Sequence, residues 1–101
     1  MKKAKFNLNQ VTAFHQYLNE CSPERLNIDS KIFAGLIQEN REIMQKHLQC
    51  KALELMHKSK QLVTCKFTRQ EVLTLSYLFG QLPCNSYLKT VEYELLRGIY
   101  I

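Results

Sequence analysis

The sequence is poor in residues that interrupt regular structure, with only three glycines and two prolines among 101 residues. So few turn-forming residues disfavour a β-sandwich, in which many short strands are joined by frequent turns. No apolar run approaches the about 18 residues that a membrane-spanning helix requires. Hydrophobic residues nevertheless make up 46% of the chain, which is typical of a folded protein. We therefore expect a single helical domain over residues 1–101 that does not insert into a membrane.

Export signals and paired-cysteine motifs are also missing. Met1-Lys2-Lys3 is followed by polar residues instead of the apolar segment of a signal peptide. The four cysteines lie far apart in the sequence, at Cys21, Cys50, Cys65 and Cys84. No two of them form a Cys-x-x-Cys pair of the kind found in metal ribbons and redox motifs. We expect a cytoplasmic protein with reduced, buried thiols, and a disulfide framework is the less favoured alternative.

What the sequence does contain is one helix-starting pattern that occurs twice. Asn7 can accept a hydrogen bond from an amide of the first helical turn, while the Gln10 side chain reaches back to the Asn7 amide. Thr68 and Glu71 repeat this capping box, and apolar residues flank both boxes where a hydrophobic staple forms. Few other aligned residues agree, so the similarity indicates shared capping chemistry rather than an internal repeat.

Apolar residues at helical spacing follow each capping box. They predict helices over residues 8–20 and 69–79, the second one ended by Gly80. A further helix is predicted to begin near Asn85 or Ser86 and to form an αα-hairpin with the helix before it. These are short helices that must pack against other elements to be stable.

The longest predicted helix covers residues 31–60, with Asp29 or Ser30 as its cap. At 1.5 Å per residue it would reach about 45 Å, so it must either bend or project from a globule of about 100 residues. The expected core stripe consists of Phe33, Leu36, Ile37, Ile43, Met44 and Leu48. Leu53 and Met56 leave this stripe, which is consistent either with neighbours on two sides or with a face that meets a partner.

A short segment over residues 61–67 is rich in strand-forming residues, and residues 99–101 could pair with it or with residues 3–6. The predicted fold class is therefore all-α, with room for a minor two- or three-stranded β element. The architecture that we expect is a small bundle of about four helices with one long central helix.

No constellation of residues identifies a reaction. His47, Cys50, Glu54 and His57 lie along one side of the long helix, and each of them could ligate zinc. They extend over about three turns, whereas a straight helix normally offers one metal ion two ligands a turn apart. We interpret the four as a polar flank of the core, and predict no catalytic residue, no metal and no cofactor.

Positive charge is concentrated in two parts of a chain whose net charge is +5. Three lysines stand at the start, and six basic residues accompany the single acid Glu54 between positions 43 and 69. Four of these bases are our candidates for contact with phosphate groups or an acidic protein surface: Lys58, Lys60, Lys66 and Arg69. The alternative is a solvated lysine face that serves only solubility.

These observations favour a small non-enzymatic interaction protein, such as an adaptor, an inhibitor or an assembly subunit, that binds a protein partner or a second copy of itself. The candidate partner-binding residues lie on the long helix: Lys46, Lys51, Leu53 and Met56. The alternative function is a nucleic-acid-associated protein whose lysines contact the phosphate backbone. Arg69 is the only arginine among the candidate phosphate contacts, which disfavours the reading of specific bases.

Overall fold

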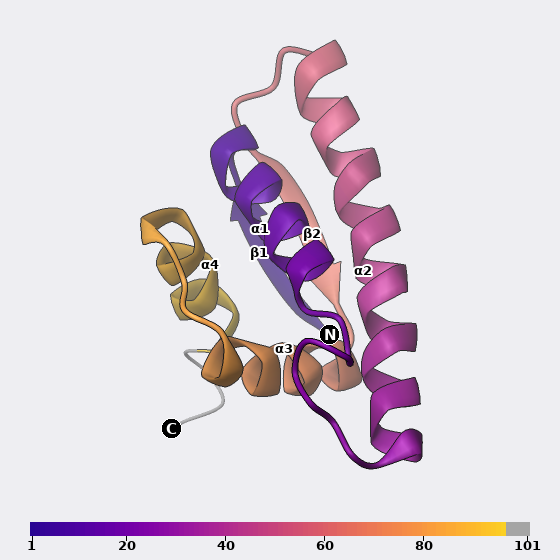
Figure 1. The fold of residues 1–101 in the computed structure, drawn as a ribbon. Coiled ribbons are helices and arrows are strands. Elements are labelled where there is room, and N and C mark those ends of the chain that lie inside the picture. Colours follow the sequence, from indigo (N-terminus) through magenta and orange to yellow (C-terminus); the bar gives the residue numbers. More distant parts are fainter. Residues whose placement is uncertain (97–101) are drawn as a thin grey trace.

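Two strands and four helices make up residues 1–96, which are the part of the chain that the computed structural model describes. In order these elements are β1 (Lys2–Phe6), α1 (Leu8–Glu20), α2 (Lys31–His57), β2 (Val63–Phe67), α3 (Arg69–Gln81) and α4 (Ser86–Leu96) (Figure 1). The predicted fold class is confirmed: the protein is a small helical globule with one long helix and a minor β element.

Both capping boxes are present. The Asn7 side chain accepts a hydrogen bond from the Gln10 amide, and the Gln10 side chain accepts one from the Asn7 amide, each at 2.9 Å. Thr68 and Glu71 make the equivalent pair of hydrogen bonds at 3.1 and 2.7 Å. As a result α1 and α3 begin at the residues that the sequence predicts.

Two helix ends differ from the prediction. α2 ends at His57 instead of near residue 60, and Ser59 after it takes a left-handed conformation with a φ of 52°. α3 continues through Gly80 to Gln81, and Leu82 caps it in an extended conformation. An isolated glycine costs a helix only about 1 kcal/mol relative to alanine, so tertiary packing can carry α3 past it.

The two strands pair in antiparallel orientation, with Ala4 opposite Cys65. Side chains alternate across a strand, so one face of the sheet points into the core. The buried side chains on that face are Ala4, Phe6, Val63, Cys65 and Phe67. The strand predicted over residues 61–67 is thus present in shortened form and pairs with β1. Residues 99–101, the other predicted strand, lie outside the described residues.

Phenylalanine rings join the sheet to α1 and α3. Phe14, in the middle of α1, stacks on Phe67 with ring centroids 5.8 Å apart and meets Phe6 edge to face at 6.4 Å. Phe79 of α3 approaches the same ring at 6.2 Å. All four rings are buried, so the core is centred where α1 crosses the inner face of the sheet (Figure 1).

The side chains of Tyr17 and Arg41 form hydrogen bonds that join α1 to α3 and to α2. The Tyr17 hydroxyl lies 2.8 Å from the Leu78 carbonyl oxygen and 2.9 Å from that of Leu82, at the end of α3. Arg41 of α2 donates a hydrogen bond to the Leu18 carbonyl, in the last turn of α1, at 2.9 Å. Both side chains donate to carbonyl groups near helix ends, where carbonyl groups lack the N–H donors of a continuing helix.

The last helix packs differently from the prediction. α4 lies mainly against α1 and makes a smaller contact with α3, so the predicted αα-hairpin is only a minor contact. Its first turn is capped by the side chain of Asn85, which accepts a hydrogen bond from the Leu88 amide at 2.9 Å. The start predicted near Asn85 or Ser86 is confirmed.

α2 forms one long edge of the molecule (Figure 1). Its length of about 40 Å, at 1.5 Å per residue, matches the longest dimension of the protein, 43 Å. The helix by itself therefore spans the longest dimension of the molecule, and both of its ends extend past α1 (Figure 1). One side packs against α1, α3 and β2, and its buried residues are Ile37, Asn40, Met44, Leu48 and Leu55.

Candidate partner-binding surface

A second apolar stripe runs along the solvent side of α2. This outer stripe consists of Ile32, Leu36, Ile43, Cys50 and Leu53. Ile32 is 81% exposed, Ile43 is 53% exposed and Leu53 is 48% exposed. At 100° per residue the five positions fall within about 100° of the helix circumference, and their centre is turned roughly 140° from the buried stripe. One helix thus presents two apolar faces, and the described residues cover only one of them.

The outer stripe shows where the predicted core face of α2 was wrong. Leu36 directly precedes Ile37, and Ile43 directly precedes Met44. Adjacent residues are 100° apart on a helix, so only one member of each pair can point into the core. Ile37 and Met44 are buried, whereas Leu36, Ile43 and also Phe33 are exposed.

Three charged residues fall in the same sector of the helix as the outer stripe, and one of them, Glu54, is paired with Lys51 and Lys60. The other two, Glu39 and Lys46, are both exposed. Neither of them forms an ion pair with any residue of the described part of the chain. The outer stripe therefore carries one uncompensated charge of each sign, seven residues apart.

The four predicted partner-binding residues do not share one surface. Lys46 and Leu53 lie on the outer stripe. Met56 is 61% exposed but is turned about 60° away from Leu53, on the side remote from Ile43. Lys51 is partly buried on the inner flank of α2, where its ammonium group lies 3.6 Å from the Glu54 carboxylate.

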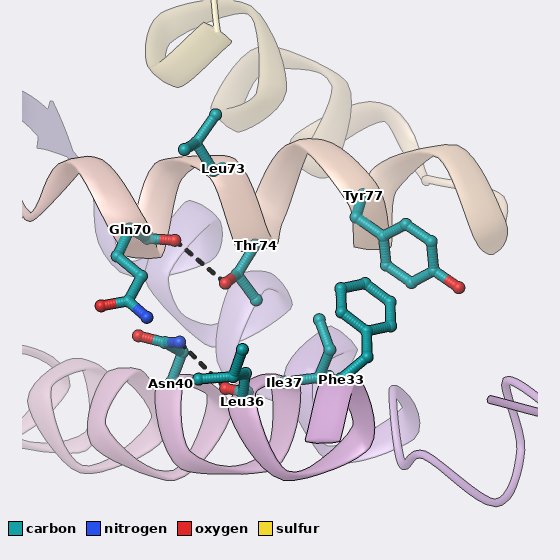
Figure 2. A pocket seen from close by; sticks show the side chains of 8 residues that line it. All are labelled: Phe33, Leu36, Ile37, Asn40, Gln70, Leu73, Thr74 and Tyr77. Carbon is teal, nitrogen blue, oxygen red and sulfur yellow. Dashed lines mark hydrogen bonds between the residues drawn. The ribbon is translucent and has the colours of Figure 1, made fainter. Parts of the chain in front are cut away.

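An apolar groove adjoins the outer stripe between the first half of α2 and α3 (Figure 2). Its walls are formed by Phe33, Leu36, Ile37, Asn40, Gln70, Leu73, Thr74 and Tyr77. The rings of Phe33 and Tyr77 meet edge to face at one end, with centroids 4.9 Å apart. Leu36 belongs to both the groove and the outer stripe, so the two form one continuous surface.

The groove is small, and several of its polar groups are already bonded. Its volume is about 140 Å³, against about 300–1,000 Å³ for ordinary small-molecule pockets. Asn40 donates a hydrogen bond to the Leu36 carbonyl and Thr74 donates one to the Gln70 carbonyl, each at 2.9 Å (Figure 2). The space suits one or two side chains of a partner better than a ligand molecule.

Basic residues gather on the outer face of the sheet. Lys3 lies directly opposite Lys66, and Lys5 points to the same side as both. All three are exposed, and we call them the basic ribbon face. Like charges directly opposite one another destabilise an antiparallel pair. A bound anion would relieve that repulsion.

The four predicted phosphate contacts are not one cluster. Lys58 and Lys60 lie before β2 and Arg69 lies after it, so they stand near opposite ends of a strand roughly 17 Å long. Lys60 donates a hydrogen bond to the Glu54 carboxylate at 3.0 Å, which holds the pKa of Glu54 below its usual range. Lys66 joins the N-terminal lysines instead.

The four residues of α2 that could ligate zinc, His47, Cys50, Glu54 and His57, do not share one environment. His47 lies beside Phe67, with ring centroids 6.1 Å apart, while Cys50 and His57 are exposed. The Glu54 carboxylate is engaged by two lysines. Within residues 1–96, no three His, Cys, Asp or Glu side chains are placed to hold one metal ion.

Three of the four thiols are shielded to different degrees. Burial raises the pKa values of Cys21 and Cys65 to about 11, and it raises the pKa of the partly buried Cys84 as well. A thiol acts as a nucleophile or metal ligand in its thiolate form. Cys21 and Cys65 are therefore suited to packing, as expected, whereas the expectation of a buried thiol is wrong for Cys50, which is exposed.

Two signals in the sequence could have located these surfaces. The apolar pairs Leu36-Ile37 and Ile43-Met44 recur seven residues apart, which indicates two apolar faces rather than one. Residues 3–6 alternate lysine with an apolar residue, and residues 64–67 alternate polar and apolar residues. This alternation predicts one basic and one apolar sheet face once the two strands are paired.

The described residues thus offer an apolar surface on α2 with its adjoining groove, and a basic ribbon face on the sheet. None of the helices within residues 1–96 combines the length and the apolar character needed to cross a membrane. No protein-family model, curated protein or solved structure matches this chain.

Proposed function

We propose that this chain is a non-enzymatic interaction protein, acting as an adaptor, an inhibitor or an assembly subunit, and that its protein partner covers the outer stripe of α2. The observation that carries the proposal is the pair of apolar faces on one helix. Complete burial of an exposed Ile or Leu side chain is worth roughly 1.5–3 kcal/mol. Ile32, Ile43 and Leu53, each about half exposed or more, together offer several kcal/mol to a partner that covers them.

The shape of the surface supports a protein partner. The outer stripe is a long, narrow row of side chains along one helix. Helices bind other helices, or grooves in a partner, through surfaces of this shape. The adjoining groove can receive an additional side chain, and Glu39 with Lys46 supplies polar contacts that orient the partner.

Affinity capture from a lysate tests this proposal. Ile43 and Leu62 are equally exposed, at 53% and 52%, but Leu62 lies in the loop before β2. We expect Ile43→Glu to abolish capture of the specific partner, because it places a charge in the centre of the apolar contact. Leu62→Glu is the matched control and should leave capture unchanged. Equal capture by both folded variants and the native chain would contradict the proposal.

A second candidate function, association with nucleic acid, is favoured by one specific observation. Lys3 and Lys66 face each other on the sheet with Lys5 beside them, and such a cluster of like charges attracts phosphate groups. The contacts would be to the nucleic-acid backbone, because lysine is a point charge and does not form the bidentate hydrogen bonds that read bases.

The salt dependence of binding to unrelated duplexes and single strands tests this candidate. We expect replacement of Lys3, Lys5 and Lys66 by Gln to reduce the slope of log K against log salt by roughly one per lost contact. Replacement of Lys58, Lys60 and Arg69 by Gln removes the same charge and serves as the control. An equal reduction by both triple variants would show attraction by net charge alone, and would contradict a role of the basic ribbon face.

The cellular compartment that we propose is the cytoplasm. All four cysteines are free within the described residues, and Cys50 is an exposed thiol. Such a thiol persists in a reducing compartment and is prone to oxidation elsewhere. Fluorescence microscopy of the tagged protein tests the location, and a secreted or membrane-bound signal would contradict it.

A further inference from the structure

We propose that the occupant of the outer stripe is a second copy of this chain, bound with the two α2 helices antiparallel and with Ile43 close to the two-fold axis. The inference rests on the proposed function of the outer stripe, and it adds the identity and orientation of the partner. Because the outer stripe is turned roughly 140° from the buried stripe of α2, the bodies of the two copies point away from each other.

When two α2 helices pair antiparallel about Ile43, apolar residues of one outer stripe lie opposite apolar residues of the other. Leu36 and Cys50 lie seven residues before and after Ile43, so each faces the other across the pair of helices. Ile32 and Leu53 are similarly placed near the two ends. A two-fold axis repeats every contact, so each apolar contact forms twice, on either side of Ile43, with Glu39 and Lys46 between them.

The charged residues of the outer stripe decide the orientation. Glu39 stands four residues before Ile43 and Lys46 stands three residues after it. An antiparallel pair therefore brings each Glu39 beside the partner subunit's Lys46, and does so twice. A parallel pair would bring Glu39 beside Glu39 and Lys46 beside Lys46, which is unfavourable for both. In the single chain neither residue has an ion-pair partner within the described residues.

The size of the contact sets the expected affinity. The outer stripe extends over roughly 30 Å of a single helix. One helix pair of this length buries less than the about 1,200–2,000 Å² of a standard stable interface. We therefore expect a reversible dimer with a dissociation constant on the order of micromolar.

Sedimentation velocity at increasing protein concentration tests the pairing through its charges. Glu39→Lys and Lys46→Glu each replace two attractive contacts by two repulsive ones, and each should weaken the dimer by about tenfold. The double variant Glu39→Lys/Lys46→Glu restores both attractions and should recover the native affinity. Glu24→Lys and Lys89→Glu make the same charge changes at exposed positions outside α2 and should have no effect.

Disulfide formation under mild oxidation tests the register. In a Cys50→Ser background, Ile43→Cys should cross-link two copies, because the two-fold axis brings this position next to itself. Ile32→Cys in the same background should not cross-link, since antiparallel pairing holds its two copies roughly 33 Å apart along the helices. Leu36→Cys in the native background should cross-link to the partner subunit's Cys50.

The outcomes separate this inference from the proposed function. A protein that stays monomeric at every concentration overturns the second-copy inference, and so does a double charge variant that fails to restore the native affinity. Cross-linking through both Ile43→Cys and Ile32→Cys would show a parallel pair, and would also overturn it. If Ile43→Glu abolishes capture of a different protein while the native chain is monomeric, the proposed function stands with another occupant. If neither capture nor assembly responds to Ile43→Glu, both proposals fail.

Discussion

His47 holds its Nε2 atom away from water, and that buried atom has no hydrogen-bond partner within the described residues. The imidazole packs edge-on against Phe67. Burial and the nearby ammonium group of Lys51 lower the pKa of His47 below its ordinary value of 6.5, and Glu71 offsets part of this effect. The folded protein therefore binds a proton at His47 less readily than the unfolded chain does.

The free energy of unfolding should fall as the pH drops below about 6.5. In that range the unfolded chain gains a proton at His47 that the folded state resists, so acid favours unfolding. We expect His47→Met to flatten this part of the stability profile, measured by urea unfolding at several pH values. His57→Gln, at an exposed position, is the control and should leave the slope unchanged. An unaltered slope in His47→Met would assign the acid sensitivity to other groups.

The thiols should differ widely in reactivity. Cys50 is exposed, whereas Cys21 and Cys65 are fully buried with pKa values of about 11. A brief pulse of iodoacetamide at pH 8 should therefore modify Cys50 first, with the two buried thiols protected until the protein opens. Mass spectrometry of the digested protein gives the three rates. Modification of all three at similar rates would contradict the packing of α1 and β2 in the fold.

At the residue scale, the sequence predicts what is decided by near neighbours. The capping hydrogen bonds of Asn7 and Thr68 join residues three positions apart, so their pattern is visible without a structure. The surroundings of His47 and the position of Lys66 opposite Lys3 depend on residues distant in the sequence. Local patterns carry no information about such contacts. For this reason the four candidate phosphate contacts, which are near in sequence, do not form one cluster in the structure.

One guanidinium group links α2 to the C-terminal end of α1. Arg41 reaches from α2 to the carbonyl of Leu18 at the C-terminal end of α1, and it is held in place by the side chain of Gln38. A cation at this end of a helix also interacts favourably with the helix dipole. Arg41 thus both bonds the helix end and complements its charge.

We expect Arg41→Met to lower the free energy of unfolding by about 1–2 kcal/mol, because it leaves the bond to Leu18 unmade while keeping most of the apolar stem. Chemical denaturation followed by circular dichroism measures the change. Arg25→Met removes an exposed arginine from the turn after α1, and it should cost much less. Equal losses in the two variants would mean that the effect arises from net charge rather than from the Leu18 contact.

At the scale of elements, the starts of helices were predicted better than their ends and partners. Caps and staples define a start locally, and α1 begins and ends where the sequence predicts. The end of α2 and the course of α3 through Gly80 depend on packing that outweighs weak local preferences. The pairing of β2 with β1 joins segments about sixty residues apart, which composition alone does not reveal.

The aromatic core connects α1, α3 and both strands through Phe14. Its ring contacts Phe67 of β2, Phe79 of α3 and Phe6 at the end of β1. We expect Phe14→Ala to destabilise the protein by about 3–5 kcal/mol, because a buried phenyl ring is lost and a cavity remains. Phe14→Leu refills part of that volume and should cost about 1–2 kcal/mol.

Urea unfolding followed by two independent probes measures these losses. Tyr87→Ala, at a position 48% exposed, provides the control and should change the stability by less than about 1 kcal/mol. If Phe14→Ala shifted only one probe, α1 would unfold separately from the rest, and the core would not act as one cooperative unit.

At the scale of the whole molecule, the sequence predicts a helical class but not the packing. The long helix and its apolar content are visible in the pattern of residues 31–60. Which of Leu36 and Ile37 points inward depends on the rotation of the whole helix about its axis, and only packing against α1 and α3 decides that. The outer stripe of α2 was not predicted as one surface, because Leu36 and Ile43 were assigned to the core and only Leu53 was placed on a partner-binding face.

The pairing of β1 with β2 also has a consequence for synthesis of the chain on the ribosome. β1 and the buried rings of Phe6 and Phe14 emerge early, but the strand that pairs with β1 and carries Phe67 emerges about sixty residues later. At roughly 5–20 residues per second, the nascent chain spends roughly 3–12 s with these apolar groups uncovered. The first third of this protein is therefore a candidate client for chaperones that hold nascent chains, until translation delivers the second strand.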